Sequence, residues 1–232
     1  MRFVKRQTAY QERRKPLVHR VPLWPVVLWA SVIAISCSRD TTPERSDTLA
    51  PAPSAAATPA PESFRVAFET TRGPFVVDVI RAWSPRGADR FHELVKAGYF
   101  TDVGFFRVVP GFVAQFGMHG DPAVNRRWSD TSIPDDPVAH SNARGTIVFA
   151  TRGPNTRSNQ FFINFSDNAR LDGMGFSPFG RVVEGMSVVD SIYAGYGETP
   201  DQGRIAADGN AYLKRQFPRL DYIKSARIVG PR

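Results

Sequence analysis

The chain has 232 residues, of which 30 are Lys or Arg and 22 are Asp or Glu, giving a formal net charge of +8. This length allows one well-cored domain and an appendage. Seven basic residues and one acid precede Cys37, which leaves 23 basic and 21 acidic residues in the rest of the chain. The positive charge therefore comes largely from the residues before Cys37, and we expect no nucleic-acid partner.

Residues 1–37 have the layout of an export signal. A basic segment precedes the uncharged apolar run 21–36, which is shorter than the roughly 20 residues needed to span a bilayer and suits a signal peptide. The only cysteine, Cys37, follows Ala-Ile-Ser, an ending that resembles a bacterial lipobox with a lipidated cysteine. An uncleaved signal anchor is the alternative. Because Ser38 follows the cysteine, we expect an exported protein, lipid-anchored on the periplasmic side of the outer membrane.

Residues 38–63 are rich in Pro, Ala, Ser and Thr and contain almost no large apolar residue, so they predict a disordered tether. The folded domain is predicted to span residues 64–232. A single cysteine allows no internal disulfide, and the four histidines are scattered without metal-ligand spacing. We therefore expect no metal and no other cofactor.

Short runs of aromatic and β-branched residues predict a mainly β domain. Helices are predicted over 84–100, where Ser84 can cap the first turn, and over 185–194. Residues 196–220 are predicted to form a long loop. Many short strands with two helices favour a closed antiparallel barrel capped by the helices. The predicted strands are 64–70, 75–80, 105–109, 112–117, 145–151, 160–165 and 222–229.

Residues 105–117, FFRVVPGFVAQFG, place Arg107 in a strand-like, largely apolar run. A guanidinium in such surroundings is costly unless something pairs with it, and no acid is nearer in sequence than Asp102 and Asp121. A bend at the Pro-Gly pair would let Arg107 and Gln115 contribute to one surface. The alternative without a functional role is an arginine that reaches solvent from the end of the barrel.

Residues 149–165, FATRGPNTRSNQFFINF, hold a polar turn between two further strand-like runs. From Gln160 onward, the side chains alternate between a wholly apolar face, which we assign to the core, and a face that mixes amides with Phe162. This mixed face would join the surface around Arg107. Its donors would be Arg107, Gln115 and Gln160, and its apolar walls Phe112 and Phe162.

Three ordered motifs resemble the cyclophilins, the cyclosporin-binding family of peptidyl-prolyl cis/trans isomerases. The first is F-x-R-x-x-P-G-F-x-x-Q-x-G at 105–117; the second joins GPNT at 153–156 to QFFI at 160–163. The third joins LDG at 171–173 to FGRV at 179–182. The resemblance covers roughly residues 64–195 and the closing strand. It implies a closed eight-stranded barrel with a helix at each end and a substrate groove outside.

The resemblance also implies roles for individual residues. Arg107 would be the catalytic arginine, acting with Gln115 and Phe112. Further positions would wall the proline pocket or hold the peptide: Phe162, Gln160, Leu171, Ala150, Thr151, Phe176 and Val113.

Three positions depart from the best-known cyclophilins. Thr151 replaces an Asn whose role is largely carried by the backbone, so this change should be tolerated. Arg170 replaces a Trp that contacts cyclosporin, which puts tight drug binding in doubt. Phe176 stands where a His lines the proline pocket, and an aromatic ring there keeps the apolar contact but loses a polar one.

The chemistry suits these residues. Rotating an Xaa-Pro bond crosses a barrier of about 20 kcal/mol and gives the twisted prolyl nitrogen a lone pair. A guanidinium that stays protonated can donate to that nitrogen, and this donation is stronger in the transition state than in the planar ground state. We predict a monomeric isomerase that acts on proline-containing peptides and unfolded or flexible cell-envelope proteins.

Two alternatives remain at this point. One is a non-catalytic proline-peptide binding module or chaperone on the same scaffold, and the other is an unrelated aromatic-rich barrel that binds, for instance, carbohydrate. The catalytic interpretation requires the Arg107 charge to face the pocket. A guanidinium turned away from Phe112 and Phe162, or locked against a carboxylate, would argue against it.

Overall fold

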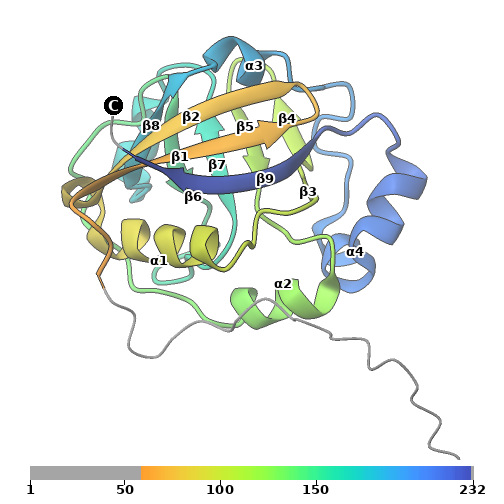
Figure 1. Cartoon of the computed structure of the whole chain (residues 1–232), viewed down its shortest axis with the longest axis horizontal. Helices are drawn as coiled ribbons and strands as arrows, with labels where there is room; N and C mark the ends of the chain where they lie inside the picture. The colour runs from red at the N-terminus through yellow and green to blue at the C-terminus, as the bar shows by residue number, and fades with distance from the viewer. Residues whose placement is uncertain (1–58, 231–232) are drawn as a thin grey trace, which may run out of the picture. The chain divides into compact units, whose positions relative to one another are not determined.

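The computed structural model describes residues 59–230 (Figure 1). The predicted signal peptide, Cys37 and most of the predicted tether therefore lie outside the described residues. The last tether residues fall inside them. Ala60 is buried, its N–H donates to Asp89 at 2.8 Å, and β1 begins at Ser63.

Within residues 59–230, nine strands form one antiparallel sheet in the order β3-β9-β1-β2-β8-β6-β7-β5-β4. Figure 1 shows that the sheet curls strongly around a central core. The bounds are β1 Ser63–Thr70, β2 Gly73–Ile80, β3 Val103–Gly104, β4 Arg107–Val109, β5 Val113–Phe116, β6 Thr146–Phe149, β7 Phe161–Asn164, β8 Pro178–Glu184 and β9 Tyr222–Val229.

The predicted closed barrel of eight strands is wrong, because the sheet has nine strands and curls into a half-barrel. Within the described residues no ladder joins its two end strands, β3 and β4. These strands are separated by two buried residues, Phe105 and Phe106. The outer edge of β4 bonds elsewhere, since the Val108 N–H donates to the Gly197 carbonyl at 3.1 Å. A non-strand segment thus covers the edge that a closing strand would occupy.

The predicted strands are all present with small shifts of their ends, whereas β3 and β8 were not predicted. β8 has three buried residues followed by four that are exposed or half-buried, without alternation. Because this pattern lacks a regular apolar face, it gives a weak strand signal.

The core is built from aromatic rings contributed by the sheet and by α1, Pro85–Lys96. Phe91 of α1 packs with its ring centroid 5.4 Å from Phe161 and 4.9 Å from Phe179. Phe68 and Phe75 of the first hairpin stack at 4.7 Å. Ring pairs at these separations add directional contacts to the burial of apolar area. These rings pack against the inner face of the sheet, opposite the groove described below.

The described residues contain four α-helices, so the prediction of two was too low. α3, Met186–Asp190, is shorter than the predicted 185–194, and α2, Pro122–Ser129, was missed. α4, Gln202–Gln216, occupies most of the segment that was predicted to be a loop. Two 3₁₀ helices, η1 Arg81–Trp83 and η2 Ala169–Met174, complete the set.

α4 escaped prediction because its helical pattern is interrupted. Asp201 caps it by accepting from the Arg204 N–H at 2.7 Å, and Ile205, Tyr212 and Leu213 form its buried face. Gly209, with φ of 55° and ψ of −137°, breaks the helix in the middle. Glycine adopts this backbone conformation at low cost, but it weakens any sequence signal for one continuous helix. No helix in residues 59–230 is long and apolar enough to cross a bilayer.

Candidate active site

The register of three adjacent strands brings the predicted catalytic residues together. Arg107 of β4 pairs with Gln115 of β5, and Gln115 pairs with Phe162 of β7. Residues directly opposite each other in neighbouring antiparallel strands point to the same face of the sheet. A cation, an amide and an aromatic ring therefore form one row across the outer face of the sheet, and Val148 of β6 continues it.

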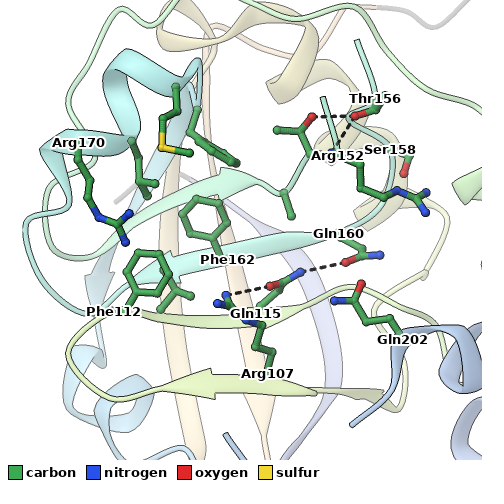
Figure 2. A pocket seen from close by; sticks show the side chains of 16 residues that line it. Arg107, Phe112, Gln115, Arg152, Thr156, Ser158, Gln160, Phe162, Arg170 and Gln202 are labelled. Carbon is green, nitrogen blue, oxygen red and sulfur yellow. Dashed lines mark hydrogen bonds between the residues drawn. The ribbon is translucent and has the colours of Figure 1, made fainter. Parts of the chain in front are cut away.

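This row lies in a groove of about 420 Å3 (Figure 2). All ten groove residues expected from the sequence line it: the predicted catalytic set and the predicted substrate-binding set, including Val113, Ala150 and Thr151. Cys37, the predicted lipidation site, lies outside the described residues.

The floor of the groove is a small apolar cluster separate from the main core. Val113, Val148, Phe162 and Leu171 are its buried members, and Phe112, Ala150 and Phe176 pack against them. The Phe176 ring stands edge-on to Phe162 at 5.7 Å, so it does occupy the pocket wall. Such a floor favours a compact apolar ring of a ligand.

The polar side of the groove is a chain of hydrogen bonds. Arg107 Nη1 donates to Gln115 Oε1 at 3.3 Å, and Gln115 Nε2 donates to Gln160 Oε1 at 3.0 Å. Figure 2 shows this chain running along one side of the Phe162 ring. The Arg107 guanidinium lies 5.6 Å from the Phe112 ring centroid, so it is not turned away from the pocket.

Arg107 also has a carboxylate partner that the sequence did not predict, and a guanidinium locked by such a partner would argue against catalysis. Its Nε donates to Glu198 Oε1 at 2.6 Å, and its Nη2 contacts the same oxygen. The two residues are 91 positions apart, and Glu198 precedes the unpredicted helix α4. No local pattern in the sequence signals this contact. The Arg107 side chain is 25% exposed and that of Glu198 is 63% exposed, so water reaches the pair.

The end of the groove formed by Ala150 and Thr151 is held by the turn that follows them. The Ala150 N–H donates to the Gln160 carbonyl at 2.9 Å, and the Thr151 hydroxyl lies 2.7 Å from that of Thr156. The Thr156 hydroxyl also accepts from the Arg152 N–H at 2.9 Å. The Thr151 side chain therefore stabilises the turn.

The groove lining includes six residues outside the predicted set. Arg152 and Arg170 add positive charge, and the Arg170 guanidinium lies 4.8 Å from the Phe112 ring centroid. Met174 is 62% exposed, which makes it an unusual apolar side chain on this surface. The others are Thr156, Ser158 and Gln202. Residues 59–230 contain no cluster of His, Cys, Asp and Glu that would hold a metal ion.

Asp172 fixes the segment that carries Leu171 and Arg170. Its carboxylate accepts from the Ser141 hydroxyl at 2.6 Å and from the backbone and side chain of Asn142 at 2.8 and 2.7 Å. Burial alone would raise the pKa of Asp172, but these hydrogen bonds lower it below its usual value. The ionised form thus anchors η2 at the edge of the groove.

Comparison with known proteins identifies the family of the chain. The family model described as cyclophilin type peptidyl-prolyl cis-trans isomerase/CLD matches residues 65–209. The peptidyl-prolyl cis-trans isomerase ppi1 of Schizosaccharomyces pombe is 38% identical over 130 residues, covering 53% of this chain and 81% of the relative. The isomerase CYP18-2 of Arabidopsis thaliana is 37% identical over 134 residues, covering 55% and 79%.

A solved structure shows the same fold at lower identity. It is a cyclophilin type isomerase of Cryptosporidium parvum, crystallised in the presence of the dipeptide Ala-Pro. It matches with a TM-score of 0.55 and 21% identity over 72% of this chain and 99% of its own. With a family model that spans more than half of its length, the chain belongs to the cyclophilin-type peptidyl-prolyl cis-trans isomerases.

Proposed function

We propose that this isomerase rotates Xaa-Pro bonds by donating a hydrogen bond from Arg107 to the prolyl nitrogen. The proline ring sits on the floor formed by Phe162 and Leu171, with Phe112 beside the guanidinium. Gln115 steadies the carbonyl oxygen of the preceding residue as the bond turns. The observation that carries this proposal is the row of Arg107, Gln115 and Phe162 across three strands, next to an apolar floor.

The ion pair with Glu198 leaves Arg107 able to act. A guanidinium has five N–H donors in a fixed plane. Glu198 takes Nε and one N–H of Nη2, and Gln115 takes one N–H of Nη1. One N–H on each terminal nitrogen remains for the substrate. Because a guanidinium stays protonated, the partly exposed pair keeps a positive group at the groove.

This donation accelerates the reaction because it strengthens as the bond twists. The planar amide nitrogen is a poor acceptor, whereas the twisted nitrogen carries a lone pair. Removing one preorganised donor from an active site lowers turnover by roughly 10²–10³-fold in other enzymes. We expect a loss of that order for Arg107→Ala.

The decisive experiment is a proline isomerisation assay on the full chain, with wild type beside Arg107→Ala. The expected result is a roughly hundredfold lower kcat/KM with an unchanged unfolding midpoint. Peptide binding by the variant, measured by calorimetry, should persist because the apolar floor is intact. Equal catalysis by the two proteins would exclude Arg107 as the catalytic group.

We further propose that the substrates are unfolded or flexible proteins of the bacterial cell envelope, reached through an N-terminal lipid anchor at Cys37. This part rests on the order of basic segment, apolar run and cysteine in residues 1–37. Mass spectrometry of the mature N-terminus from the membrane fraction should find a diacylglyceryl cysteine. Cys37→Ser should prevent this modification, and an unmodified N-terminus in the wild type would exclude the anchor.

A further inference from the structure

A short segment that follows α3 and runs into the first residue of α4 covers the outer edge of the catalytic strand. We call residues 196–202 the flanking segment. Its Gly197 carbonyl accepts from the Val108 N–H of β4 at 3.1 Å, and its Thr199 N–H donates back to the Tyr196 carbonyl at 2.9 Å. These bonds fix the backbone on both sides of Glu198 next to Arg107.

The flanking segment rests on its own apolar cluster. Ile205, Tyr212 and Leu213 of α4 pack there with Phe106, and Tyr196 packs against the cluster. The Asp201 N–H donates to the Tyr212 hydroxyl at 3.2 Å. Because burial of apolar side chains holds the helix, the start of α4 is a stable platform for Glu198.

α4 is also pinned to the rest of the domain by Asn210. Its Nδ2 donates to the backbone carbonyl and the carboxylate of Asp102 at 2.8 and 2.9 Å. Its N–H donates to the Gly120 carbonyl at 2.8 Å. The position of Glu198 relative to β4 is therefore set by the fold, although its side chain is mostly exposed.

Arg107 needs such a partner in order to hold its guanidinium in one orientation. Its hydrogen bond from Nη1 to Gln115 is long at 3.3 Å, and arginine has many side-chain rotamers. Glu198 binds Nε and Nη2 through one oxygen. This contact fixes the plane of the guanidinium.

We propose that Glu198 is a positioning residue, which holds the Arg107 guanidinium so that its remaining N–H groups face the proline pocket. This inference rests on the catalytic role proposed above for Arg107. Arg107 lines the groove and Glu198 does not, so the carboxylate holds the guanidinium without being part of the groove lining. Gln202, at the other end of the flanking segment, does line the groove and ties the same segment to the site.

The test is the proline isomerisation assay on full-length Glu198→Ala and Glu198→Gln. We expect Glu198→Ala to lower kcat/KM about five- to tenfold, since a loosely held donor spends less time aligned. Glu198→Gln should restore part of the loss, because its amide oxygen still accepts from the guanidinium. Both variants should unfold at the wild-type denaturant midpoint, since exposed ion pairs contribute little to stability.

Asp208→Asn is a matched control. It removes another exposed ion pair, with Arg204 at 3.6 Å in α4, away from the groove. Its catalysis should equal that of the wild type. A loss equal to that of Glu198→Ala would mean that disturbing α4 is sufficient, and it would overturn the assignment to Glu198.

A double variant separates positioning from a general structural effect. Adding Glu198→Ala to Arg107→Ala should cause no further loss, because there is no guanidinium left to hold. In the Glu198→Ala single variant, ¹⁵N relaxation should show a more mobile Arg107 Nε–H. Unchanged or faster catalysis by Glu198→Ala would overturn the inference, whereas full activity of Arg107→Ala would instead remove the proposed function itself.

Discussion

Two arginines of this domain stand beside phenylalanine rings at the same distance and yet differ in their surroundings. Arg107 lies 5.6 Å from the Phe112 ring centroid, and Arg157 lies 5.6 Å from that of Phe149. The side chain of Arg107 is 25% exposed and faces the groove, whereas that of Arg157 is 3% exposed.

The buried arginine is held on several sides. Nη1 of Arg157 donates to the Ser84 hydroxyl at 3.1 Å, Nη2 donates to the Asp136 carboxylate at 3.0 Å and contacts the Pro134 carbonyl, and Nε lies 3.3 Å from Asp135. Asp136 is 2% exposed and also accepts from Ser84. This network ties the 134–136 loop to the start of α1.

The difference shows which arginine is free to act. The guanidinium of Arg157 is buried, and even its Nε, which has no hydrogen bond, faces the protein interior, so it has no access to a substrate. Arg107 has two N–H groups left and an apolar floor beside them. The number of unfilled donors facing solvent, rather than the presence of an arginine near a ring, distinguishes a catalytic candidate from a structural one.

The strongest test of this comparison is Arg157→Ala. Breaking a buried ion pair typically costs about 3–5 kcal/mol of unfolding free energy. Of its ion pairs among the described residues, Asp136 would keep only the 3.4 Å contact with the more exposed Arg86. Urea denaturation followed by fluorescence would measure it. Arg107→Ala should change the same quantity by less than about 1 kcal/mol, because its partner is exposed. Equal destabilisation by the two variants would contradict the division of roles.

Arg107→Lys sharpens the comparison from the catalytic side. Lysine keeps the charge but lacks the planar fork that meets Glu198 and the substrate together. We expect kcat/KM to fall about ten- to hundredfold, equivalent to about 1.4–2.7 kcal/mol. A lysine variant with wild-type turnover would mean that charge alone suffices and that geometry at Arg107 is unimportant.

The sequence predicts the residues that line the groove better than it predicts the segments that hold them in place. Phe162 and Gln115 carry strong local signals, since strand alternation and the motif spacing both place them on one face. The register that joins Arg107, Gln115 and Phe162 follows once those strands pair. Strand ends and the unpaired edge of β4 depend on contacts that are distant in sequence, so the closed barrel was predicted wrongly.

The partners of the two arginines were beyond sequence reasoning for a physical reason. Glu198 meets Arg107 across 91 residues, and Asp136 meets Arg157 across 21. Neither pair has the three- or four-residue spacing that a helix would bring together. α4 was missed because Gly209 interrupts it. The apolar packing of α4 that holds Glu198 was therefore not predicted either.

A smaller effect on stability, confined to acidic pH, comes from Asp136. Burial alone would raise its pKa, but hydrogen bonds from Ser84 and the Gly87 N–H, together with the charge of Arg157, lower the pKa below its usual value. A carboxyl group with a lowered pKa in the folded state stabilises the fold above its unfolded-state pKa. That contribution is lost as the pH falls through the folded-state value.

The measurement compares wild type with Asp136→Asn by denaturant unfolding from about pH 6 to about pH 3. The wild type should be the more stable protein at about pH 6. The difference between the two unfolding free energies should narrow below about pH 4, since the variant has no proton to gain at this position. A constant difference over the whole range would show that ionisation of Asp136 does not contribute.

The smallest expected effect concerns substrate charge at the open side of the groove. Arg152 and Arg170 line it, no acid does, and neither has an ion-pair partner among residues 59–230. Exposed charges attract by about 0.2–1 kcal/mol, which corresponds to roughly one- to fivefold in rate or affinity. Peptides with Glu beside the Xaa-Pro pair should therefore have a modestly higher kcat/KM than those with Lys.

The double variant Arg152→Gln/Arg170→Gln provides the control for this preference. It removes both unpaired charges and leaves Arg107, Glu198 and the apolar floor in place. The preference for Glu peptides should disappear in the variant and weaken in the wild type as salt rises, because the screening length falls to about 10 Å at 0.1 M. A preference that survives both changes would have to come from the shape of the groove rather than from its charge.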